Sequence, residues 1–306
     1  MFVATRKEQK RERSYAWQRR CLRIGGVSLG FSAISSDDLR FSPDHESFEV
    51  DSSHCDIDVH LNWVDRLPPV TGERLFDSGA VWSLYEEGDR LAFDFVTPIL
   101  GRQPYKRLWV NRDFSRAQLL LNCQCVSPQR GMFALEYPVD ELLVTNWLAR
   151  GRGVEVHGCG LVDAEAGSYL FVGHSGAGKS TTTRLWTSVR NASVLSDDRI
   201  ILRRQGKQIW MYGTPWHGEA GYASSERAKL RSIFILEHGE RNEIISLPQG
   251  RAIAELFTRC FLAFHNPGVI QSVLSYLHSV TTMVPCYQYR FVPHTSAVQT
   301  ILEFHG

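Results

Sequence analysis

The sequence predicts an α/β protein in which a mixed-sheet domain, residues 151–306, follows a β-rich domain, residues 24–150, that ends in a helix. Three observations predict this class. Before residue 135, several segments alternate apolar with polar residues, as half-buried strands do. Beyond residue 151, strand-like runs are mixed with longer segments of helical period. Several of those runs follow one another with no helix between them, which favours a mixed sheet over a wholly parallel one.

Composition narrows the class of protein. The chain has 306 residues, 43% hydrophobic and 22% charged, which is typical of a soluble globular protein. Its net charge of +1 argues against nucleic acid as a partner. No apolar stretch approaches the roughly 20 residues that span a bilayer. Seven cysteines without an apolar secretory segment indicate reduced thiols and a cytoplasmic location. The composition is compatible with a homo-oligomer.

The first 23 residues are predicted to be a basic, flexible tail. Residues 5–23 hold eight basic and two acidic side chains. Such charge runs are usually solvated and carry no site. The alternative is an arm that binds nucleic acid or an acidic surface.

The β-rich domain is predicted from its strand pattern and its final helix. A turn at Glu87-Gly88-Asp89 separates two strand-like runs, as in a hairpin. Pro138 suits the first turn of the final helix, and Gly151 can end it. We place the domain boundary near this helix. The predicted strands are 47–51, 55–63, 80–86, 90–96 and 107–112, and the apolar face of the helix holds Val139, Leu142, Leu143, Trp147 and Leu148.

The second domain is predicted to begin with a strand, a loop and a helix, and to end with a strand. A helix over 179–189 follows the strand at 168–173. Two more helices are expected over 250–264 and 269–280. The predicted strands are 154–163, 168–173, 193–196, 199–204, 208–213, 231–237, 243–247 and 286–292.

The loop between that strand and helix carries the strongest chemical signal in the chain. It fits G-x-x-x-x-G-K-[ST] at every fixed position, and this pattern is the P-loop of nucleotide-binding proteins. Glycines let backbone amides turn toward phosphates, and the helix N-terminus favours the same anion. The lysine can reach the β- and γ-phosphates, and the serine hydroxyl can bind Mg²⁺. The candidate nucleotide-binding residues are Gly173, His174, Ser175, Gly176, Ala177, Gly178, Lys179, Ser180 and Thr181.

Two acidic residues and a histidine lie where catalytic groups are expected. Asp197 and Asp198 end a short apolar strand, 18 residues after Lys179. One can hold the metal while the other accepts a proton from an incoming hydroxyl. His157 lies on the strand before the loop-bearing strand, where it can orient an aspartate or bind a phosphate oxygen. Alternatively, Asp197 and Asp198 belong to a surface turn and His157 is a structural histidine.

The order of these motifs resembles the catalytic domain of HPr kinase/phosphorylase, which shares its fold group with ATP-dependent phosphoenolpyruvate carboxykinases. The resemblance covers about residues 150–300 and is specific from His157 to Asp198. It implies a mixed-sheet P-loop domain that uses ATP and Mg²⁺ to phosphorylate a serine hydroxyl on a protein. Applied to this chain, it implies that Lys179 stabilises the transferring phosphoryl group and that Ser180 and Asp198 hold the metal. Asp197 then acts as base, oriented by His157, although the two aspartates could exchange roles.

The chain departs from that family downstream. The Arg-Gly-Leu-Gly stretch of HPr kinases is absent, and residues 214–219 read Thr-Pro-Trp-His-Gly-Glu. This segment is either a loop that closes over the site or a capped turn before a helix. The acceptor is therefore expected to be a peptide or small protein, as for HPr kinase-like proteins of modified-peptide biosynthesis. The alternatives are a phosphotransferase or carboxykinase-like enzyme acting on a small metabolite, and a nucleotide-binding regulatory protein without turnover.

Overall fold

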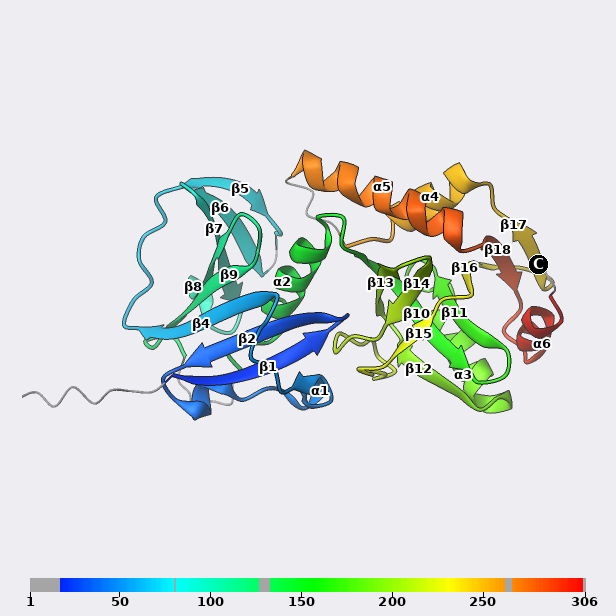
Figure 1. The fold of residues 1–306 in the computed structure, drawn as a ribbon, viewed down its shortest axis with the longest axis horizontal. Coiled ribbons are helices and arrows are strands. Elements are labelled where there is room, and N and C mark those ends of the chain that lie inside the picture. Colours follow the sequence, from blue (N-terminus) through cyan, green and yellow to red (C-terminus); the bar gives the residue numbers. More distant parts are fainter. Residues whose placement is uncertain (1–16, 80, 127–132, 262–265, 305–306) are drawn as a thin grey trace, which may run out of the picture.

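The computed structural model describes residues 17–79, 81–126, 133–261 and 266–304. The chain forms two nine-stranded sheets, one before and one after residue 150, as Figure 1 shows. We call residues 17–150 the N-terminal half and residues 151–304 the C-terminal half. Their independence as folding domains stays a prediction. Within the described residues, no helix is both long enough and apolar enough to span a bilayer.

The N-terminal sheet has the strand order β3-β1-β2-β4-β9-β8-β7-β6-β5. Neighbouring strands in this sheet are antiparallel except for two parallel pairs, β2 with β4 and β4 with β9. A two-residue turn at Gly88, whose φ is +64°, joins β6 to β7 as the sequence predicts. The strands are β1 Gln18–Ile24, β2 Val27–Ala33, β3 Glu49–Val50, β4 Ile57–Val64, β5 Glu73–Asp77, β6 Trp82–Glu87, β7 Arg90–Thr97, β8 Gly101–Asn111 and β9 Arg116–Asn122.

Part of the predicted tail is a strand. Residues 18–23 belong to β1, which pairs along its whole length with β2. Leu22 and Ile24 are fully buried, so the apolar residues that alternate with the arginines place this segment in the sheet. The rest of the predicted tail, residues 1–16, lies outside the described residues.

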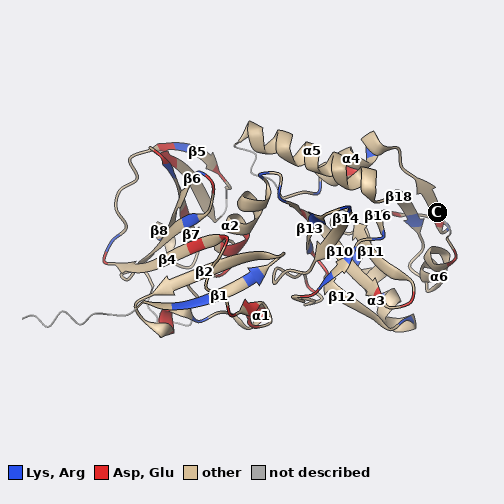
Figure 2. Ribbon diagram, in the orientation of Figure 1, with Lys and Arg blue, Asp and Glu red and all other residues tan. Residues whose placement is uncertain are grey.

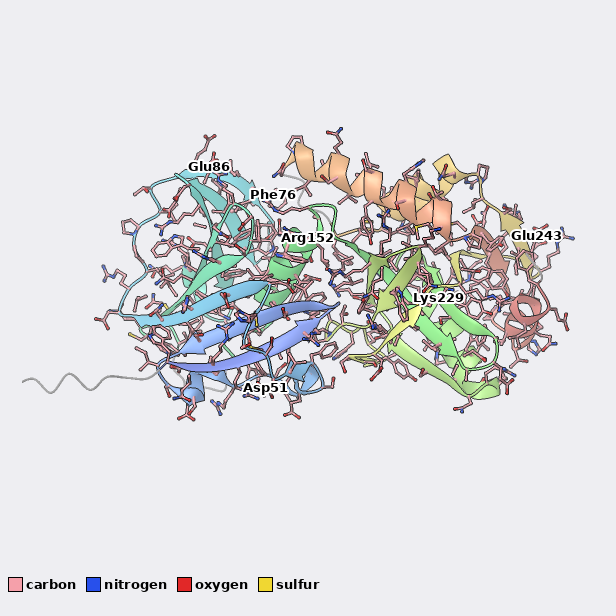
Figure 3. All side chains as sticks on the ribbon, in the orientation of Figure 1. Asp51, Phe76, Glu86, Arg152, Lys229 and Glu243 are labelled. Carbon is pink, nitrogen blue, oxygen red and sulfur yellow. The ribbon has the colours of Figure 1, made fainter. Side chains whose placement is uncertain are left out.

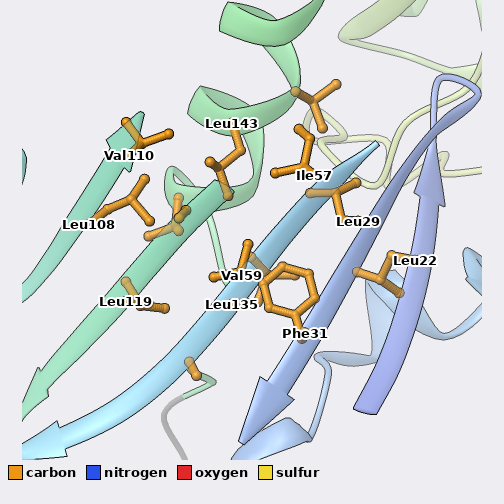
Figure 4. Close-up of a cluster of buried hydrophobic side chains, with 14 of the residues drawn as sticks. Leu22, Leu29, Phe31, Ile57, Val59, Leu108, Val110, Leu119, Leu135 and Leu143 are labelled. Carbon is orange, nitrogen blue, oxygen red and sulfur yellow. The ribbon is translucent and has the colours of Figure 1, made fainter. Parts of the chain in front are cut away.

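Aliphatic and aromatic side chains pack on one face of the N-terminal sheet (Figure 4). Leu29, Phe31, Val59, Leu108 and Leu119 belong to this core, and all are at most 2% exposed. Two short helices, η1 (Ser36–Leu39) and α1 (Pro43–Glu46), follow β2, and α2 (Val139–Leu148) ends the half. Because nine of the ten α2 residues are buried, α2 is an internal helix and not the one-sided amphipathic helix that the sequence predicts.

The C-terminal sheet is mixed, as predicted. Its order is β15-β14-β13-β10-β11-β16-β18-β17, and β12 pairs with β10 outside this path. Among the described strands of this sheet, the parallel neighbouring pairs are β11 with β16 and β16 with β18. The strands are β10 Val154–Asp163, β11 Gly167–Val172, β12 Ala192–Ser196, β13 Arg199–Gln205, β14 Gln208–Tyr212, β15 Arg227–Lys229, β16 Ser232–His238, β17 Glu243–Ser246 and β18 Cys286–Phe291.

Helices cover both faces of this sheet (Figure 1). The core on one face includes residues of α4 (Gln249–Phe257) and α5 (Pro267–Met283). The core on the other face includes residues of α3 (Lys179–Val189) and α6 (Ser296–Glu303). The helix predicted over 250–264 ends at Phe257, and the strand predicted to close the chain is followed by α6. The helix expected as one alternative after residues 214–219 is absent, because short strand β15 follows there.

Candidate functional site

The loop of residues 173–178 joins β11 to α3 and needs glycine at defined positions. Gly176 and Gly178 have φ values of +79° and +102°. A Cβ built on Gly178 would lie 2.4 Å from the Phe291 ring, and one on Gly173 would lie 2.6 Å from the Ala177 Cβ. Any larger residue at Gly173 or Gly178 would therefore displace the loop.

The loop presents amides that no described acceptor uses. Among the described residues, the N–H groups of Ser175, Gly176 and Gly178 donate to no protein oxygen. They precede the N-terminus of α3, where the helix dipole favours an anion. Lys179 Nζ donates to the carbonyl oxygens of Gly173 at 3.0 Å and His174 at 3.3 Å. A cluster of free amides and one ammonium group can hold a phosphate chain.

Lys179 is unusual because its side chain is buried and no carboxylate of the described residues contacts it. Lys179 is 8% exposed, and burial lowers the pKa of its ammonium group. The nearby carboxylate of Asp198 acts in the opposite direction and stabilises the charge. The positive charge is therefore held in the loop, where an anionic ligand would relieve its desolvation.

His157 and Asp198 lie at the same end of the sheet as the loop. Gly158, next to His157, pairs with Val172, the last residue of β11. His157 Nε2 is 3.2 Å from Asp198 Oδ1, and both side chains are partly exposed. Burial opposes ionisation of Asp198, but the hydrogen bond from His157 and the charges of Arg199 and Lys179 outweigh it and lower the pKa of Asp198. Asp198 is therefore a carboxylate at neutral pH.

Asp197 points into a different environment from Asp198. It is 3% exposed, and its two carboxylate oxygens accept hydrogen bonds from the amides of Gly218 and Ala220, each at 3.0 Å. The expected pairing of His157 with Asp197 is not present, because His157 contacts Asp198 instead. Through the two hydrogen bonds from Gly218 and Ala220, Asp197 holds the 214–220 segment next to the end of β12. This segment contains the Thr-Pro-Trp-His-Gly-Glu sequence of residues 214–219.

Arg199 connects the acidic pair to the N-terminal half. Its guanidinium group contacts Asp198 and Glu141 of α2, and its Nε is 3.5 Å from Glu155 Oε1. Glu155 is 1% exposed and accepts a hydrogen bond of 2.5 Å from Thr145 Oγ1. Burial and then the charge of Glu141 raise the pKa of Glu155 well above its ordinary value. Asp198 is thus one end of a polar network that crosses from β10 and β13 into α2.

A second contact between the halves centres on Asp140 of α2. Its Oδ2 atom accepts hydrogen bonds from His45 Nε2 at 2.7 Å and Trp216 Nε1 at 2.6 Å. Asp140 is fully buried, and Trp216 is packed in the same core as the N-terminal sheet. Because Trp216 lies two residues before Gly218, which bonds Asp197, α2 supports the segment that holds the acidic pair.

A cavity of about 430 Å³ opens beside the loop. Arg259, after α4, lines it, and its guanidinium group contacts His174 at 2.9 Å and Glu255 at 2.7 Å. Arg259 is 8% exposed, and its charge also acts on Lys179. The sequence analysis missed Arg259, because a lone arginine 85 residues from the loop carries no motif. The cavity is lined by residues 174–177 and by Ile235, Leu236, Glu237, His238, Leu247, Arg251, Glu255, Arg259 and Gln288.

The side chains at this site can supply only part of the coordination shell of a magnesium ion. No group of three or more His, Cys, Asp or Glu side chains within the described ranges is arranged to hold a metal. Mg²⁺ commonly takes one or two protein ligands and completes its shell with phosphate oxygens and water. The ionised Asp198 and the exposed hydroxyl of Ser180 are suitable donors.

The geometry thus places a strand–loop–helix turn with free backbone amides at the same sheet end as a His–Asp pair. No protein-family model and no curated protein matches the sequence. Among solved structures, the chain is similar to the HPr(Ser) kinase/phosphatase from Coxiella burnetii, with 10% identity and a TM-score of 0.28, over 48% of this chain and 91% of that one. A match at this level assigns neither a family nor an activity to the chain.

Proposed function

We propose that this protein is an ATP- and Mg²⁺-dependent kinase that transfers the γ-phosphoryl group to a serine hydroxyl of a peptide or small protein. One observation carries the proposal. The free amides of the 173–178 loop and the buried Lys179 lie at the same sheet end as the His157–Asp198 pair. An anion site next to a candidate proton acceptor is what phosphoryl transfer requires.

The loop and Lys179 bind the triphosphate in this proposal. Amides of Ser175, Gly176 and Gly178 donate to phosphate oxygens, and Lys179 leaves its loop carbonyls to contact the β- and γ-phosphates. Ser180 and Asp198 hold Mg²⁺, which neutralises charge on the transferring group when bound. Fixed donors of this kind stabilise the developing charge with little reorganisation.

The nucleoside occupies the neighbouring cavity of about 430 Å³. Volumes of roughly 300–1,000 Å³ are typical of small-molecule sites. The cavity begins at His174 to Ala177, so it continues directly from the phosphate site. Arg259 contacts His174 at the edge of the loop, where it contributes positive charge toward the phosphates.

We assign the proton acceptor to His157 rather than to Asp197. Asp197 is buried with two amides on its carboxylate, which leaves it poorly placed to receive a proton. Asp198 fixes His157 through Nε2, so the other ring nitrogen is available to the acceptor hydroxyl. The serine oxygen forms a bond to the γ-phosphorus, the bond to the β,γ-bridging oxygen breaks, and ADP leaves. The hydroxyl proton passes to His157.

The acceptor class rests on the resemblance of the motifs from His157 to Asp198, so it needs a direct test. We would incubate the protein with Mg²⁺ and γ-labelled ATP, separately with serine-containing peptides, with the same peptides carrying alanine for serine, and with oxaloacetate. We expect label on the serine peptides alone. Label on a product of oxaloacetate would favour a carboxykinase-like enzyme, and ATP binding without any transfer would favour a regulatory protein.

A further inference from the structure

Five arginines gather around two adjoining cavities at the junction of the halves, away from the 173–178 loop. One cavity, of about 770 Å³, lies between β13 and α5, and the other, of about 480 Å³, lies between β1, β13 and β14. Arg203 and Arg204 line both cavities. We call this cluster the arginine surface, and it consists of Arg23, Arg152, Arg203, Arg204 and Arg227.

These arginines lack the counter-charges that many others have. Several arginines elsewhere have a carboxylate partner, as Arg20 has Glu49 and Arg107 has Asp94. Within the part of the chain that the structure describes, no arginine of the cluster has a carboxylate in ion-pair contact. Of the described residues, Glu226 is the acidic one that lines the smaller cavity, and no acidic one lines the larger cavity. The surface therefore carries uncompensated positive charge although the chain is nearly neutral.

The guanidinium groups are oriented by neutral partners. Arg203 donates to the Gly26 carbonyl at 2.7 Å, and Arg204 donates to Ser279 Oγ at 3.4 Å. The Arg152 guanidinium lies 4.1 Å from the centre of the Trp147 ring. Figure 2 shows basic residues at the end of β1 and on β13, and Arg152 is labelled at the junction in Figure 3. Ser272, Ser275 and Ser279 of α5 add hydroxyl donors to the larger cavity.

We propose that the arginine surface binds an acidic polypeptide segment, with its carboxylates on the guanidinium groups. Arginine suits this role because its planar fork can hold a carboxylate through two hydrogen bonds. Two adjoining cavities of this size fit a chain with several carboxylates better than one small anion. Single-stranded nucleic acid fits less well, because its bases stack on exposed aromatic rings. The aromatic residues that line these cavities, Phe48, Tyr212 and Tyr276, are 1%, 5% and 9% exposed.

The test is direct binding of a fluorescein-labelled octaglutamate peptide by anisotropy, without nucleotide, at low and physiological salt. The test variant is R23E/R204E, and the control is R66E/R116E. All four arginines are exposed, and Arg66 and Arg116 likewise have no carboxylate partner among the described residues, so both variants change net charge equally. We expect the test variant to weaken binding at least about tenfold and the control less than about twofold, with binding that weakens as salt rises.

Three results would overturn the proposal. Octaglutamate could fail to bind wild-type protein at low salt, or both variants could weaken binding equally, which would indicate only long-range charge. An octa-adenylate RNA could bind more tightly than octaglutamate and be lost in the same variant, which would indicate a nucleic-acid surface. If R23E/R204E does not fold, R152E/R227E replaces it. ATP binding is measured separately, so failure at the nucleotide site is distinguishable.

Discussion

Replacing Asp140 with Asn tests whether α2 supports the segment that holds Asp197. Asp140 is fully buried, and its Oδ2 atom accepts from both His45 and Trp216, whereas Oδ1 has no hydrogen-bond partner among the described residues. In Asp140→Asn, the amide oxygen can replace Oδ2, but it is a neutral acceptor for both donors. Hydrogen bonds to charged groups contribute about 1.5–3 kcal/mol and those between neutral groups about 0.5–1.5 kcal/mol, so weakening two of them should lower the free energy of unfolding by about 2 kcal/mol.

Thermal unfolding followed by circular dichroism measures this loss. With an unfolding entropy of about 2.1 cal/mol/K per residue, a loss of about 2 kcal/mol lowers the Tm of a 306-residue chain by about 3 °C. Asp51→Asn is the matched control, because Asp51 is exposed and has no hydrogen bond to another described residue (Figure 3). We also expect slower phosphoryl transfer with little change in ATP affinity, since the 214–220 segment contacts Asp197 and not the loop. If Asp140→Asn melted within about 1 °C of the control, the buried contact described here would be refuted.

Three other predictions address the loop, the His–Asp pair and an ion pair. Gly178→Ala should abolish ATP binding, measured by calorimetry, because this position has φ of +102° and a ring carbon 2.4 Å from a built Cβ. His157→Phe removes a hydrogen bond that lowers the pKa of Asp198. As pH falls, the variant should therefore lose its Mg²⁺-dependent ATP affinity at a higher pH than wild type does. Loss of affinity at the same pH in both proteins would contradict this. Arg190 lowers the pKa of Asp163 to about 2, so this carboxylate stabilises the fold above pH ~4 and loses that effect as pH falls toward 2. Asp163→Asn should therefore cost about 2 kcal/mol in urea unfolding at pH 7 and roughly half of that at pH 3, whereas equal losses at both would exclude the ion pair as the cause.

Local patterns in the sequence predict the elements around the loop. The strand before it, the helix from Lys179 and the glycines between them follow from short-range rules on periodicity and backbone freedom. The proximity of His157 to the loop also follows, because consecutive strands commonly pair. The same rules fail for residues 18–23, where the arginines hide two buried apolar positions of a strand.

Contacts between distant segments could not be predicted from the sequence. Asp140 and Trp216 are 76 residues apart, and neither belongs to a recognisable motif. The hydrogen-bond partners of Asp197 and Asp198 could not be predicted either, because the direction of a side chain at a strand end depends on the turn that follows. His157 pairs with Asp198, to which the sequence analysis assigned the metal. For this reason the proposed proton acceptor is His157 and not Asp197.

The central claim, that the 173–178 loop and Lys179 bind the phosphates of ATP, is tested most directly by titration calorimetry with Mg²⁺ and ATP. The measurement compares wild type, Lys179→Ala and Lys207→Ala, since Lys207 is an exposed lysine in the turn between β13 and β14. We predict saturable binding to wild type and Lys207→Ala, and affinity at least about a hundredfold lower for Lys179→Ala. No heat of binding with wild type, or equal affinity for all three proteins, would contradict the account.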